Sequence, residues 1–378
     1  MTHVLLLGAG KIGTAIATFL KSTGEYDVLV GDVNESALAI VSERAGVSTR
    51  RVDVTDRSQL LDALKGRTVV ISALSYMFNP LVAETALEAG ASYFDLTEDV
   101  ETTRRVQAVS AKAADGQIFM PQCGLAPGFV GIVAHDVAKR LDSIDSVQMR
   151  VGALPMYPTN MLKYNLTWST DGLINEYCNP CEAIHRGKKT EVLALEGLEH
   201  FSVDGVRYEA FNTSGGLGTL CETLEGKVQT LNYKTVRYMG HRDLADFLIN
   251  GLRMNSKRDV LKSILEDAIP MTTQDVVIVF CTATGMIDGR YSQISDARKI
   301  YHGTVDGAHW SAIQITTAAG ICAAVDLHTQ GKLPRKGFVA QEQVLLEDFL
   351  ANRFGQYYDY VGHPTVKVKH VEAVIESA

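Results

Sequence analysis

The segment Gly8-Ala9-Gly10-Lys11-Ile12-Gly13 has the spacing G-x-G-x-x-G and lies between the apolar run Val4–Leu7 and a stretch with helical periodicity. A glycine-rich turn in this context is typical of the first βαβ unit of a dinucleotide-binding domain. Gly8 permits a tight turn, Gly10 the close approach of a pyrophosphate, and Gly13 the packing of the helix on the strand. Alone, this segment predicts a strand, a tight turn and a helix. Whether it binds a dinucleotide or only packs the helix on the strand depends on the rest of the chain.

The chain continues this alternation of short strands and helices as far as Met120. Strands are expected at Val4–Leu7, Tyr26–Gly31, Ser48–Val52, Thr68–Ala73, Ser92–Asp95 and Gln117–Met120. Apolar residues at helical spacing predict helices at Thr14–Ser22, Glu35–Ala45, Ser58–Leu64, Pro80–Ala89 and Thr102–Ala113. Such alternation predicts an α/β fold, a doubly wound Rossmann sheet with helices on both faces.

The pattern changes after Pro127, where strands become longer and alternate more clearly between apolar and polar residues. Strands are expected at Val147–Gly152, Phe201–Val203, Arg207–Phe211, Val228–Val236 and Asp275–Thr284, with helices at Thr170–Tyr177 and His241–Leu252. This half predicts an α+β domain with a mixed or antiparallel sheet. His309–His328 is expected as a long apolar helix. We therefore expect a Rossmann domain over 1–124, a substrate and dimerisation domain over 125–305, and C-terminal elements over about 306–378 that return to the first domain.

Composition excludes several classes of protein. The 378 residues carry a formal net charge of −8 and no stripe of Lys and Arg, which argues against a nucleic-acid partner. No apolar run approaches the roughly 20 residues of a membrane helix. A strand-like run follows Met1 almost at once, so we expect no signal peptide and a cytoplasmic protein. The six cysteines are expected as reduced thiols rather than a disulfide framework. A zinc or redox role for Cys178 and Cys181 is the weaker alternative, and no metal site is expected.

Asp32 indicates which dinucleotide binds. It ends the second strand, 22 positions after Gly10, where a carboxylate accepts hydrogen bonds from the adenosine ribose. A carboxylate repels a 2′-phosphate and no arginine follows directly, so NAD is favoured over NADP. Asp53 is expected either at the adenine edge or as part of a helix cap in Asp53-Val54-Thr55-Asp56. The other expected cofactor contacts are Lys11, Ile12, Val54, Ala73, Leu74, Cys123, Gly124, Leu125 and Ala126.

Motifs in the rest of the chain resemble the saccharopine dehydrogenase superfamily. They are Val70-Ile-Ser-Ala-Leu-Ser-Tyr-Met-Phe-Asn-Pro-Leu-Val-Ala-Glu-Thr-Ala86 and Ala91-Ser-Tyr-Phe-Asp-Leu96. Three others, Cys123-Gly-Leu-Ala-Pro-Gly128, Phe211-Asn-Thr-Ser-Gly-Gly216 and Lys234-Thr-Val-Arg-Tyr-Met-Gly-His241, are similar to the lysine 6-dehydrogenase branch. The likeness runs in order from residue 1 to about residue 345.

The resemblance implies NAD-dependent oxidation of the ε-amino carbon of L-lysine, followed by release of ammonia and cyclisation of the semialdehyde to a piperideine carboxylate. Other branches join or split an amino acid and a carbonyl compound, as in saccharopine and carboxynorspermidine formation. Asp95-Leu96-Thr97-Glu98-Asp99 departs from the lysine branch, where smaller residues or a histidine are expected. A related amine or imino acid therefore stays open as the substrate, and a non-catalytic NAD sensor is a further alternative.

Amine oxidation needs a base for the ammonium proton, and a carboxylate can also stabilise the iminium cation. Glu98 is expected nearest the reacting amine, with Asp95 as a structural or cofactor-side partner, although either acid can equally cap the following helix. Arg237 is the candidate clamp for the substrate carboxylate. His241 is a candidate acid, base or orienting group.

Further substrate contacts are expected from both halves of the chain. These are Tyr76, Lys163, Tyr164, Asn165, Thr213, Ser214, Gly215 and Gly216. The last four can place backbone N–H groups around an anion, with an ordinary sharp turn as the alternative. Cys123–Gly128 is expected to bridge the domains, and the Cys123 thiol is not needed as a nucleophile. Strand edges in the second half make a homodimer the default expectation.

Overall fold

The computed structural model describes residues 1–359, 368–370 and 373–375. The chain divides into two compact units. The first, the N-terminal unit, comprises 1–129 and 314–357, and the second, the central unit, comprises 130–313 and the chain from 358 onward. The sequence predicted that 306–378 returns to the first domain. Of this segment, residues 360–367, 371–372 and 376–378 lie outside the described residues.

The N-terminal unit is a doubly wound α/β domain, as predicted. Within the described residues its sheet has seven strands in the order β17-β6-β5-β4-β1-β2-β3, and all its neighbours are parallel. The strands are β1 (Thr2–Leu7), β2 (Tyr26–Asp32), β3 (Ser48–Arg51), β4 (Val69–Ser72), β5 (Ser92–Asp95), β6 (Ile118–Met120) and β17 (Gly337–Phe338). The strand order reverses at β1, between β2 and β4, and such a switch point is where ligands bind in open α/β sheets.

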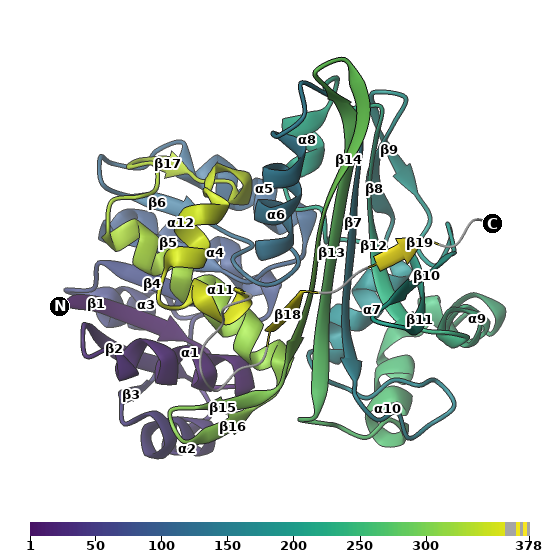
Figure 1. The fold of residues 1–378 in the computed structure, drawn as a ribbon. Helices are drawn as coiled ribbons and strands as arrows, with labels where there is room; N and C mark the ends of the chain where they lie inside the picture. The colour runs from purple at the N-terminus through teal and green to yellow at the C-terminus, as the bar shows by residue number, and fades with distance from the viewer. Residues whose placement is uncertain (360–367, 371–372, 376–378) are drawn as a thin grey trace. The chain divides into compact units, whose positions relative to one another are not determined.

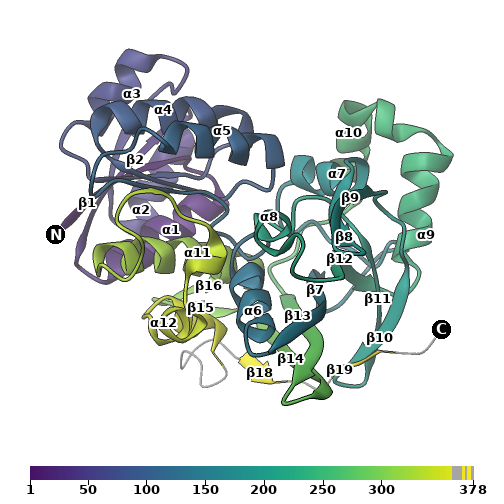
Figure 2. The same cartoon turned by 90° about the horizontal axis from the view of Figure 1, so that it is seen from above.

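Helices cover both faces of this sheet (Figures 1 and 2). On one side lie α1 (Lys11–Ser22), α2 (Glu35–Ala45) and α11 (Ala312–Thr329). On the other lie α3 (Arg57–Leu64), α4 (Asn79–Ala89) and α5 (Val100–Ser110), whose apolar residues share a core with the strands. A short C-terminal helix, α12 (Leu346–Ala351), packs through Phe349 on Phe129. Burial of both sheet faces explains why these strands are continuous apolar runs.

The central unit contains a mixed sheet with ten strands in the described part of the chain. Its spine runs β18-β14-β13-β7-β12-β11-β10-β19, and β12–β7 is the parallel pair. The strands are β7 (Ser143–Pro155), β8 (Cys181–His185), β9 (Lys188–Val192), β10 (Glu199–Val203), β11 (Val206–Asn212), β12 (Thr230–Tyr238), β13 (Asp275–Ile287), β14 (Arg290–Tyr301), β18 (Val368–His370) and β19 (Ala373–Ile375). The helices are α6 (Phe129–Ala138), α7 (Thr170–Cys178), α8 (Leu220–Leu224), α9 (His241–Asp246) and α10 (Arg258–Ala268).

The sheet of the central unit curls strongly. Phe201 on β10 packs on Phe280 of β13 with ring centroids 5.8 Å apart, and Lys299 Nζ on β14 donates to the Val203 carbonyl at 3.3 Å. These contacts join strands that are far apart in the sheet order, so one face encloses a core of its own. The helix α7 packs on the other face. Every second residue of β12 points to this face, and these residues include Tyr233, Thr235 and Arg237. The predicted α+β domain is therefore present, with β8, β9, β14 and α10 as elements that the sequence patterns did not reveal.

One predicted helix began in the wrong place. His309 lies in β16 (Ala308–Trp310), which forms a hairpin with β15 (Gly303–Val305), and the helix α11 starts at Ala312. The turn at Asp306-Gly307 closes that hairpin, and both residues have positive φ. The buried carboxylate of Asp275 then accepts the N–H groups of Ala312 and Ile313 and so fixes the start of the helix. The predicted helix His241–Leu252 is likewise α9 followed by a π-helical turn, Phe247–Gly251.

Candidate functional site

The glycine-rich turn of the N-terminal unit has the geometry that a dinucleotide requires. Gly8 has φ +107°, and a Cβ there would lie 2.7 Å from the Ala73 carbonyl oxygen. A Cβ on Gly13 would lie 1.9 Å from the Gly8 oxygen, whereas one on Gly10 would meet nothing within 4 Å. Gly8 and Gly13 are therefore required by packing, and Gly10 leaves space above the turn. Gly10 is also the N-cap of α1 and has no side chain to occupy the helix N-terminus, which suits an anionic pyrophosphate.

Asp32 lies beside this turn and holds it. Its Oδ2 accepts the Ala9 N–H at 2.7 Å, and its Oδ1 accepts the Asn34 N–H at 2.8 Å. A carboxylate oxygen accepts more than one hydrogen bond, so both oxygens keep capacity for ribose hydroxyls. Arg51 ends the neighbouring strand β3 and pairs in register with Asp32. Arg51 is exposed, so a cation lies at this edge of the sheet although no arginine directly follows Asp32 in the sequence.

The other predicted cofactor residues of this unit lie at the carboxyl ends of its strands or near them. Asp53 forms a turn in which its Oδ1 accepts the backbone N–H and the hydroxyl of Thr55, while Asp56 caps α3. The cap that was the alternative for this segment is thus made by Asp56. Ala73 donates its N–H to Leu7, and Tyr76 lies partly buried at the start of a 3-10 turn before α4. Lys11 and Ile12 begin α1, Val54 is buried after β3, and Leu74 is partly buried after β4.

Cys123–Ala126 follow β6 and pack within the N-terminal unit. Gly320 of α11 approaches so closely that a Cβ there would lie 2.7 Å from the Cys123 carbonyl oxygen. The Cys123 Sγ lies 3.1 Å from the Met120 oxygen, and burial raises the pKa of its thiol. A buried neutral thiol is a poor nucleophile. All six cysteines are free, and burial raises the pKa of Cys181 in the Cys178–Cys181 pair to about 12.

Asp95 and Glu98 follow β5 in very different surroundings. The Asp95 side chain has 0 % exposure and accepts four hydrogen bonds. Of the structural and cofactor-side roles expected for Asp95, this favours the structural one. Asp99, and not Glu98, caps α5 by accepting the Thr102 N–H at 2.7 Å. Glu98 is partly buried, and its burial, with the charges of Asp99 and Asp95, raises its pKa to about 7. A carboxyl group with a pKa near neutrality is suited to proton transfer.

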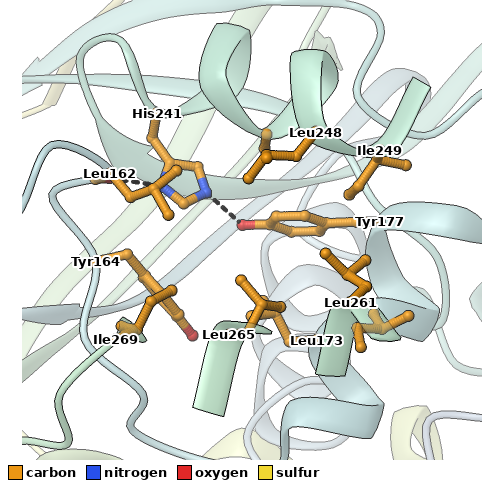
Figure 3. Close-up of a pocket in the computed structure, with 12 residues that line it drawn as sticks. Leu162, Tyr164, Leu173, Tyr177, His241, Leu248, Ile249, Leu261, Leu265 and Ile269 are labelled. Atoms are coloured by element: carbon orange, nitrogen blue, oxygen red, sulfur yellow. Dashed lines mark hydrogen bonds between the residues drawn. The ribbon is translucent and has the colours of Figure 1, made fainter. Parts of the chain in front are cut away.

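In the central unit, three buried side chains form a continuous hydrogen-bonded series, here named the Arg237 chain: Arg237, Tyr177 and His241. The Arg237 Nε–H donates to the Tyr177 hydroxyl at 2.8 Å, and this hydroxyl lies 2.9 Å from His241 Nε2 (Figure 3). His241 Nδ1 lies 2.8 Å from the Leu162 carbonyl oxygen. That oxygen only accepts, so Nδ1 carries a proton, and Nε2 then accepts the Tyr177 hydroxyl proton.

The Arg237 chain assigns an orienting role to His241. Burial, then the charge of Arg237, lowers the pKa of His241 to about 3, so the ring is neutral at pH 7 with both nitrogens occupied. It therefore fixes the Tyr177 hydroxyl, which in turn fixes the guanidinium. Arg237 is 2 % exposed, its Nη1 donates to Thr235 and to the Val236 carbonyl, and its guanidinium carbon lies 4.9 Å above the Tyr164 ring. Within the described residues, Nη2 takes no part in a hydrogen bond.

The remaining predicted substrate residues divide into two groups. Tyr164, Asn165 and Thr213 are buried, and Asn165 Oδ1 and Thr213 Oγ1 have no hydrogen-bond partner among the described residues. Such orphaned atoms suit a polar ligand, because an unsatisfied buried group is costly. Lys163 is exposed and donates to the Met239 oxygen. Ser214 donates its N–H to the Glu176 oxygen, and Gly215 and Gly218 complete a turn, so this segment forms the sharp turn that was the alternative.

Sequence reasoning missed Tyr177, Glu176 and Tyr233. Glu176 and Tyr177 lie in the last turn of α7, and the charge of Glu176 acts on both Tyr164 and Arg237. Tyr233 lies two alternations before Arg237 on β12, and its ring would be 2.3 Å from a Cβ on Gly216. The two-residue period through Tyr233, Thr235 and Arg237 was the available signal. It places these side chains on one face of the strand.

A small apolar pocket adjoins the Arg237 chain (Figure 3). Its walls include Leu173, Leu248, Leu261 and Leu265 beside Tyr177 and His241. The space open to the centre of a water molecule is about 30 Å³, whereas small-molecule sites typically measure about 300–1,000 Å³. The pocket is therefore too small to hold an amino acid and forms part of the packing around His241.

These features define a dinucleotide-binding α/β protein with a second, polar-lined α+β domain, the architecture of a two-domain dehydrogenase. The saccharopine dehydrogenase NADP binding domain matches residues 4–120, and the saccharopine dehydrogenase C-terminal domain matches residues 124–356. The chain belongs to the saccharopine dehydrogenase family, as the sequence motifs predicted.

Curated relatives and a solved structure are consistent with this assignment. The chain is 22 % identical over 360 residues to the mitochondrial alpha-aminoadipic semialdehyde synthase of Rattus norvegicus, a match that covers 87 % of this chain and 37 % of that protein. It is 24 % identical over 260 residues to the saccharopine dehydrogenase [NADP(+), L-glutamate-forming] of Saccharomyces cerevisiae, covering 66 % of this chain and 57 % of the yeast protein. The apo structure of the L-Glu-forming yeast enzyme covers 100 % of both chains with a TM-score of 0.76 at 17 % identity, which shows a shared fold.

Two features of the described residues bear on other classes of function. None of the helices in that part of the chain is long and apolar enough to cross a membrane. No group of three or more His, Cys, Asp or Glu side chains among them is arranged to hold a metal ion.

Proposed function

We propose that this chain is an NAD(P)-dependent oxidoreductase that acts on a carbon–nitrogen bond of an amino acid. The observation that carries this proposal is the guanidinium of Arg237, which is buried and held at Nε and Nη1. In the same unit, the buried oxygens Asn165 Oδ1 and Thr213 Oγ1 have no hydrogen-bond partner among the described residues. A fixed guanidinium suits a carboxylate, since its fork donates two parallel hydrogen bonds. The dinucleotide turn supplies the second half of the argument, and its residues fit the cofactor.

Each unit contributes a separate part of the chemistry. Arg237 binds the substrate carboxylate, and Asn165 and Thr213 offer their unpaired oxygens to its polar groups. Glu98 takes the ammonium proton, because only the free amine releases hydride readily. Once this proton has passed to solvent, the restored Glu98 carboxylate would stabilise the iminium cation electrostatically. A nicotinamide cofactor, when bound, would supply the hydride acceptor. Asp32 and the glycine-rich turn hold the adenosine and pyrophosphate parts of the cofactor.

The finer proposal is oxidation of the ε-amine of L-lysine. Loss of a proton to Glu98 and of hydride from Cε leaves an iminium group, to which water adds before ammonia departs. The product, 2-aminoadipate 6-semialdehyde, then cyclises. One carboxylate and one α-ammonium on lysine are matched by one buried arginine and the nearby charge of Glu176. Purified protein with NAD and L-lysine is expected to form NADH and ammonia in equal amounts, and the absence of both with lysine and other diamino acids excludes this activity.

A second candidate is a saccharopine-type enzyme that joins an amino acid and a carbonyl compound by reducing their imine, or splits the joined product. The similarity to the L-glutamate-forming yeast enzyme favours it. It predicts NAD(P)H oxidation only when both substrates are present, which separates it from the lysine proposal in one assay. Cofactor binding without turnover in either assay would favour a sensor instead.

The cofactor preference proposed is NAD, on the basis of the Asp32 carboxylate. The exposed Arg51 on the adjacent strand end is the feature that favours NADP, and the matching domain is described as NADP binding. Direct titration of both dinucleotides measures this preference independently of turnover.

A further inference from the structure

Four buried side chains join three segments at the carboxyl edge of the N-terminal sheet, and we name them the Asp95 network: Ser72, Asn79, Tyr93 and Asp95. Ser72, at the end of β4, donates its hydroxyl to Asn79 Oδ1 at 2.7 Å. Asn79, the first residue of α4, donates its amide N–H to Asp95 Oδ2 at 3.2 Å. Tyr93 on β5 donates its hydroxyl to the same oxygen at 2.6 Å. All four side chains have 2 % exposure or less.

The second oxygen of Asp95 binds only backbone. Oδ1 accepts the N–H of Thr97 at 2.9 Å, in the loop that carries Glu98, and the N–H of Gln122 at 3.0 Å, in the loop after β6. Gln122 has φ +64°, a left-handed conformation that a residue with a side chain rarely adopts. Thr97 continues the series, because its hydroxyl accepts the Asp99 N–H at 3.1 Å. One carboxylate therefore fixes two loops relative to β4 and α4.

We infer that Asn79 and Tyr93 are positioning residues that, through Asp95, hold the Glu98 loop and the Gln122–Ala126 loop in the arrangement needed for hydride transfer. The inference rests on the proposed function, since it gives those two loops a role at the nicotinamide. Neither residue has to touch substrate or cofactor. Asn79 and Tyr93 saturate Oδ2, and a carboxylate held in this way presents Oδ1 in one direction to Thr97 and Gln122. Without one of these donors, Asp95 can turn and release either loop.

The unit contains a matched control for this inference. Tyr26, at the amino end of β2, donates its hydroxyl to the buried carboxylate of Asp326 at 2.5 Å. Tyr26→Phe thus removes the same kind of bond as Tyr93→Phe, from the same domain, at the opposite end of the sheet from the two loops. A purely structural role predicts the same outcome for both variants.

The experiment compares wild type, Tyr93→Phe, Asn79→Ala and Tyr26→Phe in amide hydrogen exchange and in turnover of NAD with C6-dideuterated and ordinary L-lysine. We expect Tyr93→Phe and Asn79→Ala to speed exchange at Thr97 and Gln122 by about tenfold and to lower kcat by about tenfold. We also expect a larger primary isotope effect, with the Kd for NAD changed by less than about twofold. Tyr26→Phe is expected to change none of these. Ser72→Ala, which keeps both bonds to Asp95, is a milder variant if Asn79→Ala does not fold.

Three results would overturn the inference. One is equal changes in Tyr93→Phe and Tyr26→Phe, and another is unchanged exchange at Thr97 and Gln122 in Tyr93→Phe. The third is a loss of kcat in Tyr93→Phe without any change in the isotope effect. If the wild-type protein turns over no amino acid with either dinucleotide, the proposed function fails, whereas the exchange data alone still decide whether Tyr93 and Asn79 hold the two loops.

Discussion

A buried tyrosine hydroxyl lies at the centre of a hydrogen-bond network in each unit, but the two hydroxyls have opposite partners. Tyr93 donates to the carboxylate of Asp95, which also accepts two backbone N–H groups. Tyr177 accepts from the Arg237 guanidinium and donates to the neutral His241 ring. The Asp95 network thus fixes backbone loops, while the Arg237 chain fixes side chains, including the guanidinium that we propose binds the substrate carboxylate.

The difference also gives the two networks opposite responses to pH. Burial raises the pKa of Asp95 to about 6, above its ordinary value, although the Tyr93 hydroxyl opposes the shift. Burial and the Arg237 charge lower the pKa of His241 to about 3. Both groups are therefore easier to hold neutral in the fold than ionised. Asp95 is neutral when protonated, so its contribution to stability is larger at low pH. His241 is neutral when deprotonated, so its contribution is larger at high pH.

The largest effect that separates the two regions is expected at Glu98, next to the Asp95 network. Glu98→Gln removes the base and is expected to lower kcat by about 10²- to 10⁴-fold. In the unaltered protein, kcat is expected to rise with pH through about 7, where Glu98 ionises. Steady-state turnover between pH 5 and pH 9 measures both effects. Glu101→Gln, at an exposed position in the first turn of α5, is the control. A loss of less than about threefold in Glu98→Gln would exclude this residue as the base.

The next effect tests the carboxylate site proposed at Arg237. Arg237→Met is expected to lower kcat/KM for the amino acid by about 100-fold, or about 3 kcal/mol, because a buried charge partner of the carboxylate is lost. The Kd for the dinucleotide should not change. Arg258→Met is the control. Arg258 also contacts the end of α7, because it donates hydrogen bonds to Asn175 and Asn179, but it is not part of the Arg237 chain. Equal losses in both variants would mean that Arg237 only stabilises the fold.

The third prediction uses the opposite pH responses directly. Between about pH 4 and pH 6 the folded state binds the Asp95 proton more tightly than the unfolded state does, so this group's contribution to stability falls as pH rises. Between about pH 3 and pH 6.5 the unfolded state binds the His241 proton more tightly, so that contribution rises with pH. Each slope is at most about 1.4 kcal/mol per pH unit.

Urea denaturation at several pH values tests this difference in paired variants. Asp95→Asn should make the stability of the protein rise more steeply with pH over that range, and His241→Asn should make it rise less steeply. Parallel curves for the two variants would contradict the opposite signs. The comparison uses slopes, because each substitution also changes stability at every pH.

The fold was predictable where one physical signal dominated. Strands buried on both faces, such as Val4–Leu7, and helices with a glycine or an acid at one end, such as Glu35–Ala45, were predicted within a residue or two. The start of α11 was not, because it depends on the Asp275 carboxylate, 37 positions earlier in the chain. The curl of the second sheet was also out of reach, since it follows from packing between distant strands such as β10 and β13.

The candidate site shows the same division. Asp32 and the glycine-rich turn follow from local spacing, and the structure gives them the expected geometry. Tyr177 was missed because a helix prediction does not say which face its last turn presents, and that face depends on β11 and β12. Asp95 and Glu98 looked alike in sequence, and only the surrounding donors, Asn79 and Tyr93 among them, separate a saturated carboxylate from an available one.

The smallest expected effect concerns the cofactor edge of the N-terminal unit, remote from both tyrosines. Asp32→Ser removes the charge that repels a 2′-phosphate while Arg51 stays on the adjacent strand end, so the ratio of NADP to NAD affinity should rise by about tenfold, or about 1.4 kcal/mol. Asp27→Ser, at the partly exposed opposite end of the same strand, is the control. Because Asp32 also binds the Ala9 and Asn34 N–H groups, both affinities should fall somewhat, and the ratio is the quantity that isolates the charge. An unchanged ratio would mean that this carboxylate only holds the glycine-rich turn. In that case Arg51→Ala should lower NADP affinity alone, and the preference would lie with the arginine.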